Sequence, residues 1–197
     1  MKKISFLVIL SMVLVTGLTA QHETLFNRAR VVGGFGAPLI EMGISNDLNT
    51  SVGGGGGIVI NNFFLGGYGM GSVDFNELFD NGDVEVLDIG HGGFWLGTTI
   101  SPYKMLHFYT SARIGWGAVN VDLQDNNQKY SDIDKIFVMT PELGVELNLT
   151  RWFRVVGTAG YRWVNGTSDG REYTDEDFSG AVATIALRFG WFGSKRW

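Results

Sequence analysis

Apolar and polar residues alternate along this chain, and the alternation is clearest over residues 136–165. Over residues 137–149 every second side chain is apolar, and the positions between them are mostly polar or glycine. A period of two predicts a β-strand with one apolar face and one polar face. The same pattern resumes after residues 150–151, so the whole stretch is typical of a hairpin with a short turn.

Comparable segments recur along the chain and predict eight strands in all. They are longer than the usual strand of about 5–6 residues, and they suit strands of roughly 9–11 residues that cross a bilayer at a tilt. No window has a helical period, so we expect essentially no helix apart from an amino-terminal leader. The predicted strands are residues 30–42, 51–60, 63–73, 86–100, 106–118, 137–149, 153–163 and 179–192.

The connections between these segments alternate between short and long. The four long ones are residues 43–50, 74–85, 120–135 and 165–178, and they hold 15 of the 20 carboxylates. Short turns on one side and long loops on the other are typical of outer-membrane barrels, and an even number of strands puts both termini on the periplasmic side. We therefore expect an acidic surface on the long-loop side.

Charged residues in the last four predicted strands fall on one face only. A charge that faces lipid near the midplane costs about 2–4 kcal/mol, so the apolar face is expected outside and the charged face inside. The sequence therefore predicts an all-β, eight-stranded antiparallel up-and-down transmembrane β-barrel. The alternative is a soluble lipocalin-like barrel, which would put its apolar face inside, around a ligand. The predicted interior charges are Arg113, Glu142, Glu146, Arg154, Arg162 and Arg188.

In the first four predicted strands, glycine makes it harder to tell which residues face inward and which face outward. Residues 53–57 are all glycine, and because no Lys-Ser or Lys-Thr pair follows them, a bent strand is favoured over a phosphate-binding loop. In the fourth strand the apolar phase changes at Gly92 and Gly93, which predicts a β-bulge. Tryptophans near strand ends predict aromatic girdles at the membrane interfaces. The tryptophans concerned are Trp95, Trp116, Trp152, Trp163 and Trp191.

The amino end indicates a secreted protein, and the composition excludes several kinds of site and partner. Residues 1–20 have Lys2 and Lys3, an apolar run and a small-residue end, which is the layout of a secretory signal peptide. The run is too short for a spanning helix of roughly 20 residues, so we expect a signal peptide at 1–20 and a barrel domain at 21–197. The chain has no cysteine, which leaves no disulfide or thiolate metal site. A net charge of −5 without a basic stripe argues against a nucleic-acid partner.

Eight strands enclose a space that side chains can fill, and buried charges need partners there. We expect Glu146 to pair with Arg154, and Glu142 to pair with Arg113 or Arg162, depending on register. Such pairs favour a salt-bridge plug that keeps the barrel closed. A narrow polar conduit for ions or small solutes is the alternative.

Candidate catalytic chemistry is sparse. His107, Ser111 and Glu142 share the interior face, and lipid-modifying hydrolases need a histidine, a serine and an acid together. A lipid hydrolase would work at the lipid-facing rim, however, where no His–Ser pair is closely spaced. The histidines also lack a metal-ligand spacing. We therefore expect no enzyme, no cofactor and no metal site.

The whole pattern over residues 28–192 resembles the small eight-stranded outer-membrane proteins of Gram-negative bacteria, of the outer membrane protein A and X type. Residues 187–192 look like the aromatic carboxyl-terminal signal that the barrel-insertion machinery reads, and residues 53–71 look like porin-like proteins of Bacteroidetes-type bacteria. The resemblance implies an outer-membrane location. It also implies three partners: outer-membrane lipid, lipopolysaccharide, and the insertion machinery during assembly.

The function predicted is that of a non-enzymatic outer-membrane barrel with an envelope-structural or surface-binding role through its four acidic loops. A narrow channel is the first alternative. A lipid-modifying enzyme and a soluble ligand-binding barrel are less favoured.

Overall fold

The structure is a computed structural model that describes residues 29–44, 50–73, 87–125, 128–166 and 174–193. The described residues from Val31 onward form one compact unit, the barrel. Residues 1–20, the predicted signal peptide, lie outside the described residues, so that assignment and the domain boundary at residue 21 stay predictions. No helix among the described residues is long and apolar enough to span a bilayer.

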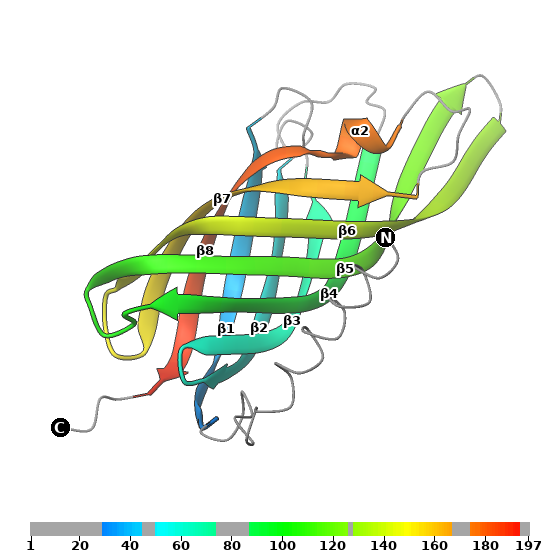
Figure 1. Ribbon diagram of the computed structural model, residues 1–197. Helices are drawn as coiled ribbons and strands as arrows, with labels where there is room; N and C mark the ends of the chain where they lie inside the picture. The colour runs from blue at the N-terminus through cyan, green and yellow to red at the C-terminus, as the bar shows by residue number, and fades with distance from the viewer. Residues whose placement is uncertain (1–28, 45–49, 74–86, 126–127, 167–173, 194–197) are drawn as a thin grey trace, which may run out of the picture. The chain divides into compact units, whose positions relative to one another are not determined.

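Eight antiparallel strands form a closed barrel in the order β1 to β8, and β1 pairs with β8 to complete it. Closure gives every strand a paired neighbour on both sides, and a bilayer would not tolerate an open sheet. Figure 1 shows the strands in this order around the barrel. The predicted eight-stranded antiparallel barrel is confirmed. The strands are β1 (Val31–Gly43), β2 (Ser51–Ile60), β3 (Phe63–Ser72), β4 (Leu87–Ile100), β5 (Leu106–Asp125), β6 (Gln128–Asn148), β7 (Phe153–Asn165) and β8 (Gly180–Phe192).

Two of the short turns follow directly from their residues. Asn61 has φ 56° in the turn between β2 and β3, a conformation that asparagine tolerates better than most residues. Between β4 and β5 the Lys104 N–H donates to the Ser101 carbonyl at 3.0 Å, which places Pro102 second in a β-turn, as predicted. The end of the barrel that carries these turns is called the short-turn end, and the opposite end the long-loop end.

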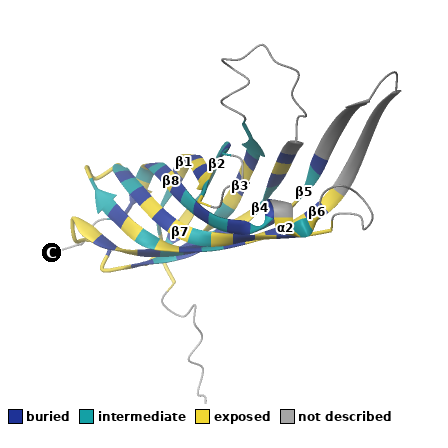
Figure 2. Ribbon diagram, turned by 90° about the horizontal axis from the view of Figure 1, so that it is seen from above, coloured by how far each residue is buried: buried dark blue, intermediate teal, exposed yellow. Residues whose placement is uncertain are grey.

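Buried and exposed residues alternate along the strands, as Figure 2 shows for β7 and β8. In β5 to β8 the phase is the predicted one, with apolar side chains outside and charged ones inside. Apart from Lys135, near the long-loop end of β6, no charged strand residue whose side chain is described faces outward. Large apolar side chains exposed on the exterior include Ile40, Ile58, Leu65, Phe94, Phe108, Leu143 and Ile185.

The fourth strand departs from the prediction. The register of β4 with β5 runs unbroken from Leu87 opposite Val121 to Ile100 opposite Phe108, so the predicted bulge at Gly92 and Gly93 is wrong. A register shift does occur at the start of β1. The apparent phase change in β4 arises because its interior face also carries large apolar residues, Ile89 and Trp95, so hydrophobicity does not distinguish the two faces.

Trp95 is a second correction. This side chain is only 2% exposed and lies inside the barrel, so it is not part of an exterior girdle. Trp116, Trp152, Trp163 and Trp191 are all more than half exposed on the outside. Trp152 lies in the turn between β6 and β7 and Trp191 near the end of β8, whereas Trp116 and Trp163 lie toward the other end. The exterior tryptophans therefore fall into two belts, as interfacial aromatics do.

The glycine run forms half of β2, which pairs along its length with both β1 and β3. Residues 53–57 are thus ordinary members of the sheet ladder and not a loop. Close backbone contact explains part of the glycine content, since a Cβ at Gly66 of β3 would overlap the carbonyl oxygen of Gly56 in β2.

One predicted long loop is largely strand. Backbone pairing between β5 and β6 continues to Asp125 opposite Gln128, so residues 120–125 and 128–135 form the end of a long hairpin. The hairpin reaches past the neighbouring strands at the long-loop end (Figure 1). Ladder hydrogen bonds join backbone groups whatever the side chains are, so a polar sequence can continue a hairpin in water. The expectation of essentially no helix has one exception among the described residues, the single turn α2 (Asp175–Phe178) between β7 and β8.

Candidate functional site

The interior holds a first charge cluster in its middle and long-loop part. Arg113 of β5 lies between Glu41 of β1 and Glu142 of β6. It donates through Nη2 to Glu41 Oε2, and to Glu142 Oε1 at 3.0 Å. Arg162 of β7 donates from Nη1 to Glu41 Oε1 at 2.9 Å. All four side chains are buried. Because β1 is far from β5 and β7 along the chain, these ion pairs join distant strands across the barrel interior.

Hydroxyl groups complete this first cluster. Ser111 Oγ donates to Glu142 Oε2 at 3.0 Å, and Thr158 Oγ1 donates to Glu142 Oε1 at 3.1 Å. Arg113 also donates to Thr184 Oγ1 at 3.2 Å. A buried ion pair offsets the cost of leaving water only if its remaining lone pairs and protons are also bonded. The Glu142 carboxylate, on β6, meets that condition through its partners on β5 and β7.

A second charge cluster lies at the short-turn end and is centred on Glu146 of β6. Arg188 Nη1 donates to Glu146 Oε1 at 2.7 Å, and Arg154 Nη1 donates to Glu146 Oε2 at 3.2 Å. His107 Nε2 lies 2.8 Å from the same Oε2 atom, and its Nδ1 lies 3.1 Å from the Lys104 carbonyl oxygen in the adjacent turn. One carboxylate therefore serves two guanidinium groups.

Aromatic rings cover the flat faces of these two arginines. The Arg188 guanidinium carbon lies 3.8 Å from the ring centre of Phe35, and that of Arg154 lies 3.9 Å from the ring centre of Phe192. Cation–π contacts of this kind are worth about 2 kcal/mol or more when water is excluded. Phe35 also meets Phe64 and Trp95 edge to face, at 5.3 and 5.5 Å between ring centres. The aromatic layer thus fills the interior between strands β1 to β4 and β8.

A cluster of apolar side chains lies at the long-loop end of the interior. Phe178 of α2 is 4% exposed and packs with residues from β4 to β7. Its carbonyl oxygen accepts a hydrogen bond from Arg162 Nε at 2.9 Å, which ties α2 to the first charge cluster. The members of this apolar cap are Ile89, Val119, Ile136, Val138, Val164 and Phe178.

All six charged residues selected from sequence lie in the interior, in two separate clusters. Glu146 pairs with Arg154, and Glu142 pairs with Arg113, whereas Arg162 binds Glu41 instead. Sequence reasoning missed Glu41. Glu41 lies an even number of residues from Phe35, Ala37 and Leu39, which all point inward, so strand alternation alone could have placed it in the interior.

The candidate catalytic residues do not come together as a triad. His107 binds Glu146, whereas Ser111 binds Glu142. The serine hydroxyl and the imidazole are therefore held by different carboxylates, and both are buried away from the lipid face. Within the described part of the chain, no three His, Asp or Glu side chains gather as metal ligands would.

The sequence matches no known family model and no curated protein. Solved structures do match the fold. The N-terminal barrel domain of Pseudomonas aeruginosa OprF aligns with a TM-score of 0.55 at 12% identity, over 82% of this chain and 98% of that one. OprH, outer membrane protein H of P. aeruginosa, aligns with a TM-score of 0.54 at 11% identity, over 80% and 99%. This is the fold of small outer-membrane β-barrels. At such low identity the likeness concerns architecture and carries no ligand or activity to this chain.

Proposed function

We propose that the protein is an integral barrel of the outer membrane, non-enzymatic, with an envelope-structural or surface-binding role. The apolar exterior and its two tryptophan belts support the membrane setting, because among the described strand side chains only Lys135, near the long-loop end of β6, turns a charge outward. Fractionation tests this location. The chain should stay with outer membranes after a salt wash and should run at a different gel mobility when unheated; recovery in the soluble fraction would contradict the proposal.

The filled interior supports a structural role over a transporting one. Two charge clusters, an aromatic layer and the apolar cap together fill the described interior. An eight-stranded barrel is only wide enough to be packed in this way. Purified protein in planar bilayers should therefore give no stepwise conductance above that of protein-free bilayers. Regular steps in the wild-type chain would overturn the plugged barrel.

The same geometry supports the non-enzymatic assignment. Ser111 donates its hydroxyl proton to a carboxylate instead of a histidine, so the nucleophile–base contact of a serine hydrolase is not formed. Lipid A and phospholipids from cells that express the protein should keep their masses. A mass change that depends on Ser111 and His107 would argue for the enzyme.

Surface binding would fall to the long loops. We infer that lipid and lipopolysaccharide are the partners in the membrane, with divalent cations bridging loop carboxylates and lipopolysaccharide phosphates. Most of the loop carboxylates lie outside the described residues, so this proposal rests on composition. Lipopolysaccharide should co-purify with the protein in Mg²⁺ and be released by chelator. Retention in chelator would exclude the cation bridge.

One observation favours a second candidate, a narrow polar conduit. Several buried polar atoms of the interior have no hydrogen-bond partner among the described residues, and His91 Nε2, Trp95 Nε1 and Thr140 Oγ1 are three of them. Groups of this kind usually bond ordered water. If they belong to a water-filled path, conductance steps will appear and will change when Glu142 or Arg154 is substituted, as they would not in a sealed barrel.

A further inference from the structure

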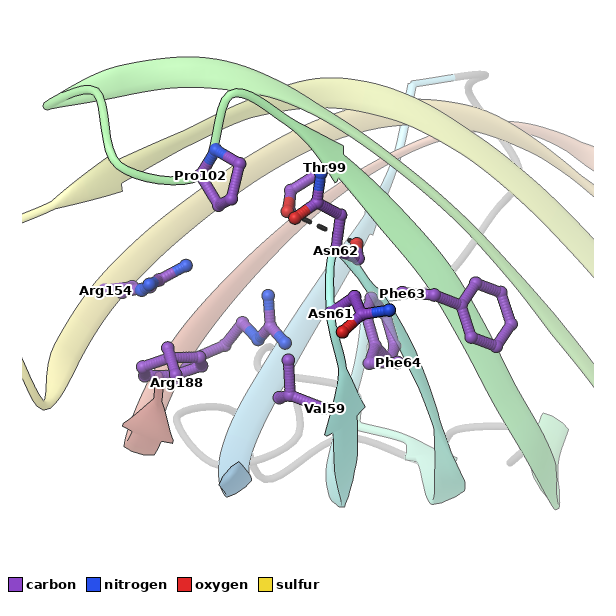
Figure 3. A pocket seen from close by; sticks show the side chains of 10 residues that line it. Val59, Asn61, Asn62, Phe63, Phe64, Thr99, Pro102, Arg154 and Arg188 are labelled. Carbon is purple, nitrogen blue, oxygen red and sulfur yellow. Dashed lines mark hydrogen bonds between the residues drawn. The ribbon is translucent and has the colours of Figure 1, made fainter. Parts of the chain in front are cut away.

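A small hollow opens at the short-turn end of the interior, beside the second charge cluster. The centre of a water molecule can move within about 10 Å³ inside it, so the hollow has room for one water molecule or one ion of similar size. Figure 3 shows Arg154 and Arg188 on one side of this space and the turn at residues 61–62 on the other. Thr99, Pro102 and Phe192 complete the wall used in the argument below.

The charge around this hollow is not balanced. In the first cluster, Arg113 and Arg162 meet two carboxylates, those of Glu41 and Glu142. In the second cluster, two arginines share the single carboxylate of Glu146. Counted over its two arginines and its one carboxylate, the short-turn cluster therefore carries an excess of one positive charge. An excess charge that is removed from water is costly unless a counter-charge accompanies it.

The two arginines also have donors to spare. Each uses Nη1 for Glu146, while the Nε atoms of both Arg154 and Arg188 are buried and have no hydrogen-bond partner among the described residues. Their residues are 7% and 2% exposed. The rings of Phe192 and Phe35 cover the flat faces, so the edges of the guanidinium groups are what remains to bind a ligand. Guanidinium edges favour anions.

The opposite wall is held in place. The backbone N–H of Thr99 donates to the Asn62 carbonyl at 2.9 Å, and Thr99 Oγ1 donates to the same oxygen at 3.4 Å (Figure 3). A rim fastened in this way limits how far the hollow can widen. The enclosed space therefore selects for a small ion over a bulky one.

We propose that this hollow is a binding site for one small anion of the size class of chloride, which enters from the short-turn end. The anion contacts the edges of Arg154 and Arg188 and neutralises the excess charge of the second cluster. It thereby stabilises the folded barrel, because it binds the folded chain and not the unfolded one. This site is independent of whether the barrel conducts or what its loops bind.

Thermal unfolding of the full chain in detergent tests the proposal, with chloride compared against gluconate at equal ionic strength. The midpoint should rise with the logarithm of chloride concentration and stay lower in gluconate, which is too large to enter. Arg154→Gln should weaken the apparent chloride affinity at least about tenfold, the usual effect of losing a hydrogen bond to a charged group. Arg162→Gln is the matched control: it removes a guanidinium from the first cluster and should keep the full chloride response.

Three results would overturn the site: equal midpoints in the two salts, a full chloride response in Arg154→Gln, or an equal loss in Arg162→Gln. If Arg154→Gln does not fold, a bromide soak of the wild-type protein still tests the site. Crystals soaked in bromide should give an anomalous peak within hydrogen-bond distance of Arg154 and Arg188. No peak there at full bromide exchange would reject the site, and neither result would change the conductance test of the proposed function.

Discussion

Replacing Glu146 with glutamine is the sharpest test of how the interior is held together. The substitution keeps the size of the side chain and removes its charge. Glu146 accepts hydrogen bonds from Arg188 at 2.7 Å and from Arg154 at 3.2 Å, with His107 at 2.8 Å. A glutamine has one acceptor oxygen and a donor group in place of two acceptor oxygens. Two buried guanidinium groups would then lose the only carboxylate that the described residues offer them.

The size of the effect follows from the burial of these groups. Removing one partner of a buried ion pair costs about 3–5 kcal/mol, because the other charge stays buried and unpaired. Arg154→Gln should cost less, about 1.5–3 kcal/mol, since Arg188 and Glu146 remain as a one-to-one pair. With a urea dependence of about 2 kcal/mol per molar, the midpoint should fall by roughly 1.5–2.5 M in Glu146→Gln and by roughly 1 M in Arg154→Gln.

Reversible urea unfolding in lipid vesicles, followed by tryptophan fluorescence, measures both variants on the same scale. If the dependence of the unfolding free energy on urea concentration is the same in all chains, a change in midpoint reports a change in stability. The order matters more than the absolute values. If Arg154→Gln were as destabilising as Glu146→Gln, the cost would come from lost packing on Phe192 and not from unbalanced charge, and the electrostatic reasoning would be refuted.

Three further predictions concern the barrel wall and the cap. Gly66→Ala should prevent assembly, because its Cβ would overlap a carbonyl oxygen of β2, whereas Gly69→Ala, whose Cβ meets nothing within 4 Å, should keep heat-modifiable gel mobility; equal behaviour would contradict the register of β2 and β3. In variants with a single tryptophan, brominated lipid should quench Trp116 strongly and Trp95 weakly, since Trp116 is 59% exposed and Trp95 only 2%; the reverse would put the wrong faces outside. Phe178→Ala should lower unfolding free energy by up to about 3–5 kcal/mol; no change in the urea midpoint would mean that α2 does not close the barrel.

The second half of the barrel could be predicted because charge and hydrophobicity agree there. In β7, Arg154 and Arg162 point inward while Trp163 points outward, so the residue type at each position shows which face of the strand it lies on. The membrane forces this separation, since hydrocarbon rejects charge on the outside. Period-two analysis therefore recovers both the strands and their orientation.

The first half could not be phased in the same way. In β4 the inward residues include Ile89 and Trp95, and the outward ones include Phe94 and Leu96. A hydrophobic side chain is allowed on either face of such a strand, because the interior there is an aromatic layer. Apolar alternation then carries no information on orientation, which explains both the false bulge and the misplaced tryptophan.

Partner choice inside the barrel depends on closure, which no local pattern contains. Glu142 and Arg113 lie on neighbouring strands, so a short-range argument finds that pair. Arg162 turns instead to Glu41, which is 121 residues away along the chain. The two meet only because β1 and β8 pair and bring the first strand beside the last ones.

Glu41 also explains how an apolar, glycine-rich half can have a defined register. Strands with little side-chain contrast are prone to slippage, and a slip of one residue would turn every side chain of β1 to the other face. Such a slip would carry the Glu41 carboxylate out of the interior, away from Arg113 and Arg162, and toward lipid. The cost of that exposure, with two guanidinium groups left unpaired, far exceeds any difference in apolar packing between the two faces. The buried Glu41 carboxylate therefore fixes the register of β1, which the glycines of β2 and β3 cannot do. It does so through ion pairs across the barrel interior with Arg113 of β5 and Arg162 of β7, strands whose own charged residues fix which face points inward.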